Sequence, residues 1–248
     1  MKKFTSFIKE NLDSKIENIS HYIDKGSGSF GSNPGGVYTN PSDNSNHYVK
    51  FYPNSNQARG EVAAGKIGEL MGAHNVGHRL VSHNGNIGVA SKWNPNLEPI
   101  QKHDFDSMGD NDLSQLSKHF HSAVLTRDWD RVGLGYDNLM KDPSNGNISN
   151  VDAGGTFGFR AQGAPKPGEF SSDIGEYNTL RDPNINPQNA HVFSKLKDEH
   201  LKSIKPHLQA LNHEKVHSIF TSVGLGDPIG HTNSLMARRD ALLSKYSS

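Results

Sequence analysis

The chain of 248 residues carries 26 Lys plus Arg and 26 Asp plus Glu, so its formal net charge is zero. A balanced charge gives no overall attraction to nucleic acid or to an anionic membrane, and we expect neither as a partner. The sequence has no cysteine, which excludes disulfides, thiolate zinc sites and a cysteine nucleophile.

The N-terminus begins like a signal peptide but lacks an apolar core and a small-residue cleavage site. Its apolar residues Phe4, Phe7, Ile8 and Leu12 recur at helical spacing, which predicts a short amphipathic helix over residues 1–18. No apolar run approaches the roughly 20 residues that a membrane-spanning helix needs. We therefore expect a soluble protein without a Sec signal peptide.

A Gly-rich segment occupies residues 26–36. Gly26, Gly28 and Gly31 match the pattern GxGxxG, which is a weak signal and is equally typical of a flexible loop. A tighter turn, Gly31-Ser32-Asn33-Pro34-Gly35-Gly36, directly precedes a strand-like stretch. Because glycine lets backbone N–H groups approach phosphates, either part is a candidate phosphate cradle. No βαβ pattern surrounds the segment, which argues against dinucleotide binding.

Two short strands over 36–39 and 47–52 and a helix over 57–72 follow in the predicted order. Lys50 lies inside the second strand, where a charge is ordinarily a solvated surface residue, and Glu61 lies on the helix. A lysine that pairs with a helix carboxylate beside a Gly-rich turn is suited to contacting nucleotide phosphates.

A β-hairpin is predicted over 79–93, because the strong turn signal Asn84-Gly85-Asn86 separates two apolar stretches. The hairpin ends at Trp93, and two prolines within residues 94–100 then predict a linker between lobes. A helix over 111–127 follows, with its apolar residues on one side.

A second hairpin is predicted over residues 138–152, with Pro143-Ser-Asn-Gly-Asn147 as its turn. A hairpin of this length returns the chain on itself, so that Asn138 and Asp152 can meet at its open end. An amide and a carboxylate are hard oxygen ligands, and they are followed here by Gly154-Gly155. The pair therefore predicts a site for Mg²⁺ that bridges nucleotide phosphates.

Three carboxylates, Asp128, Asp130 and Asp137, precede Asn138. Loop aspartates are ordinarily helix caps and turn formers. In a phosphoryl-transfer site, one of them is placed to accept the proton of the acceptor hydroxyl group. The residues alone leave open which of the three aspartates would be the base.

The C-terminal part begins with a Pro/Gly-rich stretch over 160–189, predicted as a long loop, and two or three helices are expected after it. The loop carries Arg160, Lys166 and Arg181, and a loop of this length is more often functional or mobile than incidental. Strands and helices segregate along the chain instead of alternating. The order predicts an α+β fold.

His213-Glu-Lys-Val-His217 is a literal HExxH motif on a predicted helix, as in zinc peptidases. Phe220 stands where the metzincin extension requires glycine, and the plausible third ligands soon after are Asp227 and His231. The chain has 14 histidines, which makes a chance match easier. A zinc peptidase is therefore the rival enzyme class, and surface histidines are the ordinary interpretation.

Taken in order, the Gly-rich segment, Lys50, Glu61, the loop from Asp130 to Asn138, and Asp152-Ala-Gly-Gly resemble an atypical member of the protein-kinase-like superfamily. The chain is most similar to small bacterial effector and toxin kinases, including minimal type III effector kinases that act on a eukaryotic heat-shock chaperone. HipA-type toxin kinases and phosphoinositide-kinase-like folds are more distant comparisons. The resemblance covers residues 25–160, and beyond them it suggests only a helical lobe.

By position, the resemblance implies that Lys50 contacts the ATP phosphates and Glu61 orients it. It further implies Asp130 as the base, with Asn138 and Asp152 holding Mg²⁺. Gly31, Ser32, Gly35, Gly36 and Trp93 are the remaining candidate ATP-binding residues.

The sequence also departs from the common kinase pattern. No His-Arg-Asp triplet is present, and Asp152 is followed by Ala-Gly-Gly instead of Phe-Gly. Asp130 precedes Asn138 by eight positions, where the common pattern has five. These departures keep an inactive kinase-fold binding module as an alternative.

The resemblance implies a compact two-lobed fold with an N-terminal helix over 1–24, a β-rich lobe over 25–97 and a mainly helical lobe over 98–248. The implied reaction is ATP- and Mg-dependent phosphoryl transfer to Ser or Thr of a protein substrate, such as a host chaperone. We expect a monomer that resides in the bacterial cytoplasm before delivery into a host cell.

Overall fold

The structure is a computed structural model that describes residues 16–26 and 33–247. Most of the predicted N-terminal helix, together with Gly31 and Ser32, lies outside these residues. The end of that predicted helix is wrong, because Glu17–Asn18 form strand β1, which pairs in parallel with a later strand. A strand of two residues is too short for the spacing of apolar residues to distinguish it from the end of a helix.

The first sheet has six strands in the order β1-β6-β7-β4-β3-β2. Its strands after β1 are β2 (Ile23–Asp24), β3 (Gly35–Thr39), β4 (Asn46–Phe51), β6 (Arg79–His83) and β7 (Asn86–Lys92). The predicted hairpin over 79–93 is present, and β6 pairs antiparallel with β7. Asn84 and Gly85 connect them with φ angles of 49° and 80°. Both angles are positive, as a tight two-residue hairpin turn requires.

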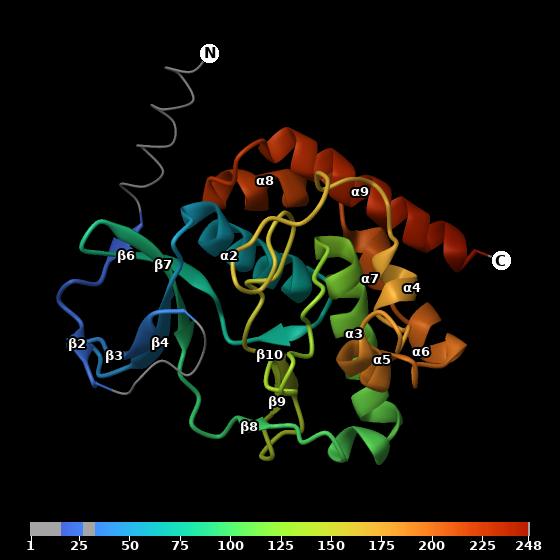
Figure 1. Cartoon of the computed structure of the whole chain (residues 1–248), viewed down its shortest axis with the longest axis horizontal. Helices are drawn as coiled ribbons and strands as arrows, with labels where there is room; N and C mark the ends of the chain where they lie inside the picture. Colours follow the sequence, from blue (N-terminus) through green and yellow to red (C-terminus); the bar gives the residue numbers. More distant parts are fainter. Residues whose placement is uncertain (1–15, 27–32, 248) are drawn as a thin grey trace.

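Helix α2 (Ser55–Leu70) lies between this sheet and the helical part of the molecule (Figure 1). The Asn54 side chain caps it by accepting from the Asn56 N–H. Small residues let neighbours approach closely: a Cβ atom added at Gly65 would lie 2.9 Å from the His78 ring, and one at Gly68 would lie 3.2 Å from Ser122 Oγ. The helix is therefore buried along most of its length, and its side chains are held in fixed positions.

The second sheet has four strands in the order β5-β10-β9-β8. The strands are β5 (His74–Asn75), β8 (Glu98–Pro99), β9 (Leu139–Lys141) and β10 (Ile148–Asn150). The predicted hairpin over 138–152 is present with shorter strands, and Asn138 and Asp152 flank it. β5 precedes β6 in the sequence yet pairs with β10, so the chain crosses between the two sheets before residue 97. The division at 97–98 stays a prediction.

Helix α3 (Asp110–Thr126) is the central helix of the C-terminal part (Figure 1). The other elements there are η1 (Asp104–Asp106), α4 (Glu176–Thr179), α5 (Pro187–Phe193), α6 (Asp198–Lys202), α7 (Lys205–Ala210), α8 (His213–Val223) and α9 (Pro228–Lys245). Two predictions are wrong here. The stretch 160–189 contains α4 and the start of α5, and five helices of the described chain, α5 to α9, replace the two or three expected. Helices of four to seven residues are too short to show a helical period in sequence.

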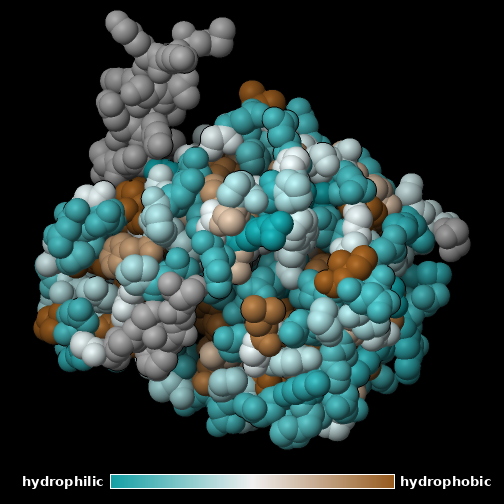
Figure 2. Space-filling view, viewed as in Figure 1, coloured by the Kyte–Doolittle hydropathy of each residue, from teal (hydrophilic) through white to brown (hydrophobic). Residues whose placement is uncertain are grey.

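The main hydrophobic core joins α2, the hairpin β9–β10 and the C-terminal helices. A smaller cluster, including Ile19, Val49 and Val81, packs within the first sheet. The visible surface is predominantly hydrophilic, with scattered apolar side chains (Figure 2). In the described part of the chain, no helix combines the length and apolar character needed to cross a membrane.

Candidate active site

Lys50, Glu61 and Asp152 come together from three separate elements. Lys50 lies on β4, in the interior of the first sheet, while Glu61 lies on α2 and Asp152 follows β10. Lys50 Nζ is 2.7 Å from Glu61 Oε1 and 3.1 Å from Asp152 Oδ2. Lys50 and Glu61 are buried, and the Asp152 side chain is 39% exposed. The ammonium group therefore joins the sheet, the helix and the second hairpin.

The positive charge of Lys50 and the negative charge of Asp152 stabilise each other. Burial lowers the pKa of Lys50, but Asp152 and Glu61 outweigh that effect and hold it well above its ordinary value. Partial burial raises the pKa of Asp152, but Lys50 and the Gly154 N–H outweigh that effect and hold it below its ordinary value. Lys50 is therefore an ammonium ion and Asp152 a carboxylate at neutral pH.

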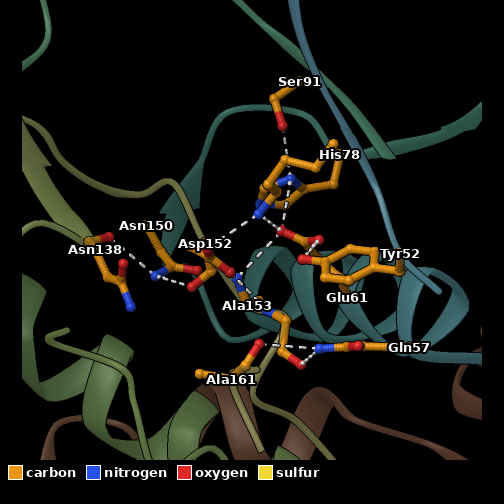
Figure 3. A network of polar contacts seen from close by, with 12 residues as sticks. Tyr52, Gln57, Glu61, His78, Ser91, Asn138, Asn150, Asp152, Ala153 and Ala161 are labelled. Carbon is orange, nitrogen blue, oxygen red and sulfur yellow. Dashed lines mark hydrogen bonds and ion pairs between the residues drawn. The ribbon is translucent and has the colours of Figure 1, made fainter. Parts of the chain in front are cut away.

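Glu61 is held in place by groups that the sequence did not single out (Figure 3). Tyr52 donates its hydroxyl hydrogen to Glu61 Oε2 at 2.6 Å, and the Ala153 N–H donates to Oε1 at 3.3 Å. His78 Nδ1 is 3.8 Å from the same Oε1 and 2.9 Å from Ser91 Oγ. Burial lowers the pKa of His78, so its ring is neutral near pH 7. Tyr52 follows Lys50 by two positions, a spacing that places both on one face of a strand.

The loop before β9 separates the three aspartates by environment. Asp128 is buried, lies 3.0 Å from Arg131 Nε and accepts the Asp130 N–H at 3.0 Å, so it supports the loop. Asp137 is exposed. Asp130 is half-buried, and burial together with the charges of Asp128, Asp152 and Asp137 raises its pKa to about 7. A carboxyl group with this pKa is well suited to general-base chemistry at neutral pH.

Asn138 and Asp152 flank the β9–β10 hairpin as predicted, and Asn150 connects their backbones. Asn150 Nδ2 donates to the Asn138 carbonyl at 3.1 Å and to the Asp152 carbonyl at 2.9 Å (Figure 3). The Asn138 amide donates to the Asp130 carbonyl at 2.7 Å. The amide nitrogen of Asn138 is therefore used in a hydrogen bond within the protein, and its amide oxygen Oδ1 remains as an acceptor. An amide oxygen and a carboxylate are the kinds of ligand that Mg²⁺ prefers, and the role of this pair in holding the ion stays a prediction.

Of the predicted phosphate cradle, Gly35 and Gly36 are described, and they begin β3. Gly35 pairs with Lys50 and Gly36 with Val49 in the antiparallel register. A Cβ atom at Gly35 would lie 2.1 Å from the Val49 carbonyl oxygen, so only glycine fits there. Trp93 follows β7, is 38% exposed and donates its backbone N–H to the Asn46 carbonyl. The ATP-binding roles of these residues, and of Gly31 and Ser32, stay predictions.

The segment after Asp152 is fixed at two points that the sequence did not reveal. Gln57 on α2 donates to the carbonyls of Gly154 and Ala161 at 3.0 and 3.1 Å (Figure 3). The buried Lys166 donates to the Gly155 carbonyl at 2.7 Å and to the Arg127 carbonyl. Lys166 thus joins the loop that carries Asp130 to the segment that carries Asp152. Burial lowers the pKa of Lys166 to about 7.

The close approach of the segment after Asp152 to Tyr52 depends on Gly154. A Cβ atom at Gly154 would lie 2.4 Å from the Tyr52 hydroxyl oxygen. One at Gly155 would lie 3.4 Å from the Asp130 Cβ. Glycine is therefore required at position 154, whereas the contact at position 155 is an ordinary van der Waals distance.

The HExxH motif lies at the surface, on the first turns of α8. His213 Nε2 is 3.3 Å from Asn233 Oδ1, and His217 Nε2 is 3.4 Å from Thr221 Oγ1. Among the described residues, the one group of three His, Asp or Glu side chains close enough to share a metal ion is Asp110, Glu199 and His200. The plausible third ligands, Asp227 and His231, do not complete such a group with the motif. The geometry does not support a zinc peptidase.

Comparison with known proteins bears on the fold. No protein-family model matches the chain, and no curated protein matches it in sequence. The crystal structure of the Helicobacter pylori proinflammatory kinase CtkA is similar, with a TM-score of 0.62 and 14% identity over 93% of this chain and 95% of that one. HipA of Shewanella oneidensis MR-1, in its complex with HipB and operator DNA, gives a TM-score of 0.43 and 9% identity, over 98% of this chain and 72% of that one.

The fold class is therefore a bacterial kinase-like fold, with a β-rich N-terminal lobe and a mainly helical C-terminal lobe. This chain shares the arrangement of its helices and strands with CtkA over nearly the whole length of both proteins. This confirms the predicted α+β, two-lobed kinase-like fold.

Proposed function

We propose that this protein transfers the γ-phosphoryl group of ATP, with Mg²⁺, to a Ser or Thr hydroxyl group of a protein substrate. The observation that carries the proposal is the contact of Lys50 with both Glu61 and Asp152, at 2.7 and 3.1 Å. A lysine held by a helix carboxylate, beside the residue that follows the second hairpin, is the arrangement of an assembled phosphoryl-transfer site.

The roles of the side chains follow from their positions. Lys50 places a permanent positive charge where the ATP phosphates bind, and Glu61 fixes its direction. Asn138 Oδ1 and the Asp152 carboxylate would hold Mg²⁺, which would neutralise charge on the phosphates when it is bound. Asp130 accepts the proton of the acceptor hydroxyl group as that oxygen attacks. Positioning and charge stabilisation supply most of the rate acceleration.

The biological setting is a further part of the proposal. A protein acceptor, such as a host heat-shock chaperone, agrees with the resemblance to effector kinases. We infer a monomer that is made in the bacterial cytoplasm and delivered into a host cell, with no nucleic-acid or membrane partner. The balanced net charge of the chain supports the last point.

Incubation of the full chain with γ-labelled ATP and Mg²⁺, with and without a mixture of Ser/Thr peptides, tests the function. We expect label in peptide or in the protein, and a loss of at least about 100-fold in Lys50→Met and Asp152→Asn. Lys66→Met, which removes an exposed lysine from the same helix as Glu61, is the matched control and should label like wild type.

Equal labelling by Lys50→Met and wild type would refute the assignment. If nucleotide binds with Mg²⁺ but neither label transfer nor ATP hydrolysis occurs, the chain is the inactive kinase-fold binding module instead. Stoichiometric zinc that is lost in His213→Ala would support the peptidase alternative instead.

A further inference from the structure

The loop between Asp130 and Asn138 presents an apolar side chain to solvent. Leu134 is 75% exposed, the highest value among the exposed large hydrophobic side chains of the described chain. The second highest is Ile185, at 63%. A single exposed apolar side chain is ordinary on a protein surface. These two are notable because both lie in segments that contact the candidate active site.

Leu134 is held outward by a constrained loop. Gly133 has a φ of 82°, and a Cβ atom there would lie 2.3 Å from Asp137 Oδ1, so the turn requires glycine. The Gly133 N–H donates to the Asp130 carbonyl at 3.0 Å, and the Asn138 N–H donates to the Val132 carbonyl at 3.2 Å. Both sides of the tip are therefore tied to the residues that would carry the chemistry.

The same loop is anchored by aromatic packing. The Tyr136 ring lies 5.9 Å from the Phe105 ring and 5.7 Å from the His191 ring on α5. Val132, on the other side of Leu134, is fully buried. Leu134 is thus the apolar residue of this loop that the fold leaves in water, although its neighbours on both sides are packed.

Ile185 is attached to the same part of the site. The next residue, Asn186, donates its side-chain amide to the Trp129 carbonyl at 2.7 Å, and Asn189 donates to the same oxygen at 3.1 Å. Trp129 directly precedes Asp130. The Ile185 loop and the Leu134 loop therefore adjoin one another through Trp129 on one side and through the Tyr136–His191 contact on the other.

We propose that Leu134 and Ile185 form the surface that receives the polypeptide around the phosphoacceptor residue, and that the substrate offers an apolar side chain beside its Ser or Thr. This inference rests on the proposed function and deepens it by naming the substrate class. It also accounts for the eight-position interval from Asp130 to Asn138, because the longer loop forms the tip that carries Leu134. Apolar side chains on a rigid support gain binding energy by being covered, at little cost in conformational entropy.

The test uses Ser/Thr peptide mixtures in which one position beside the acceptor is fixed at a time, with the full chain, Mg²⁺ and γ-labelled ATP. We expect wild type to favour Leu, Ile, Met or Phe over charged residues by about tenfold at one or more positions, as covering one such side chain allows. In Leu134→Ser combined with Ile185→Ser, this ratio should fall below about twofold. Ile229→Ser is the matched control, because Ile229 is 61% exposed on α9.

A ratio near one in wild type, or an unchanged ratio in the double variant, overturns the inference. So does ATP turnover without labelling of any peptide, because the proposed surface accepts a polypeptide. A chain that neither hydrolyses ATP nor transfers label defeats the proposed function itself, which separates the two failures.

Discussion

The Lys50 cluster and the Asp130 loop both contain carboxylates, but their surroundings shift the pKa of Asp152 and that of Asp130 in opposite directions. In the cluster, one ammonium ion contacts two carboxylates, and both Lys50 and Asp152 keep their charged forms. Around Asp130, the carboxylates of Asp128, Asp152 and Asp137 reinforce the effect of burial, and its pKa rises to about 7. In the first region Lys50 and the carboxylates attract one another, whereas the second region becomes more stable when a cation or a proton is added.

The largest expected effect comes from removing the ammonium ion of Lys50. Lys50→Met leaves Glu61 buried without its partner, so we expect loss of phosphoryl transfer and a decrease of about 3 kcal/mol in the free energy of unfolding. Urea denaturation followed by circular dichroism measures the decrease. Lys50→Met combined with Glu61→Gln should recover part of it, and an additive double variant would show that the two charges are not coupled.

Asp130→Asn should separate activity from stability. We expect a 10²- to 10⁴-fold loss of phosphoryl transfer, roughly what removal of a general base costs. The raised pKa means that Asp130 stabilises the folded protein below about pH 4, and that this contribution is lost as the pH rises through about 7.

The variant should therefore be more stable than wild type at pH 8, by about 1 kcal/mol or about 2–4 °C in melting temperature, and the gain should shrink toward pH 4. Thermal unfolding at both pH values measures this. If Asp130→Asn is less stable than wild type at pH 8, the inference that neighbouring carboxylates destabilise the charged form of Asp130 is wrong. Asp137→Asn, at an exposed position of the same loop, is the comparison that tests the alternative base.

The connection between the two regions is expected to have a smaller effect. Lys166→Met removes the donor that joins the Arg127 and Gly155 carbonyls. We expect about a tenfold decrease in kcat with little change in KM for ATP, because the Lys50 cluster stays assembled. Lys166→Arg should recover part of the rate. A rise in KM with unchanged kcat would mean that Lys166 supports nucleotide binding instead.

The smallest effect is the pH dependence of the wild-type rate. At low Mg²⁺ concentration the rate should rise severalfold between pH 6 and pH 8, as Asp130 loses its proton. Higher Mg²⁺ concentration should move the midpoint downward, because a cation near Asp152 favours the Asp130 carboxylate. Initial rates across this pH range measure the shift. A midpoint that does not respond to Mg²⁺ would place the titrating group away from the metal site.

Local chemistry made much of the site predictable from the sequence. The turn residues Asn84-Gly85 and the turn over 143–147 identified both hairpins, because few residues accept positive φ angles. Strand and helix periods placed Lys50 and Glu61 on neighbouring elements. These signals lie within a few residues of the groups that they position, so no knowledge of the tertiary structure is needed to interpret them.

Other parts depended on contacts between distant segments. Gln57 and Lys166 each bond to carbonyls brought near by the fold, and no local pattern marks them. The parallel pairing of β5 with β10 joins segments about 75 positions apart in the chain. The short helices α4 to α7 follow from packing on the core, since helices of this length have little stability of their own.

By itself, the sequence determined the α+β order, the two hairpins and the set of candidate residues, because backbone propensity and turn chemistry act locally. Only the tertiary structure showed that Asp128, Asp130 and Asp137 lie in different environments, because burial and neighbouring charge are properties of the folded chain, and the role of Asp130 as the base stays a prediction. It also left His213 and His217 at the surface without a third ligand in the described residues, and it left Leu134, in the loop after the candidate base, exposed to solvent. A motif specifies which groups are available, and the fold specifies which of them share a low-dielectric environment.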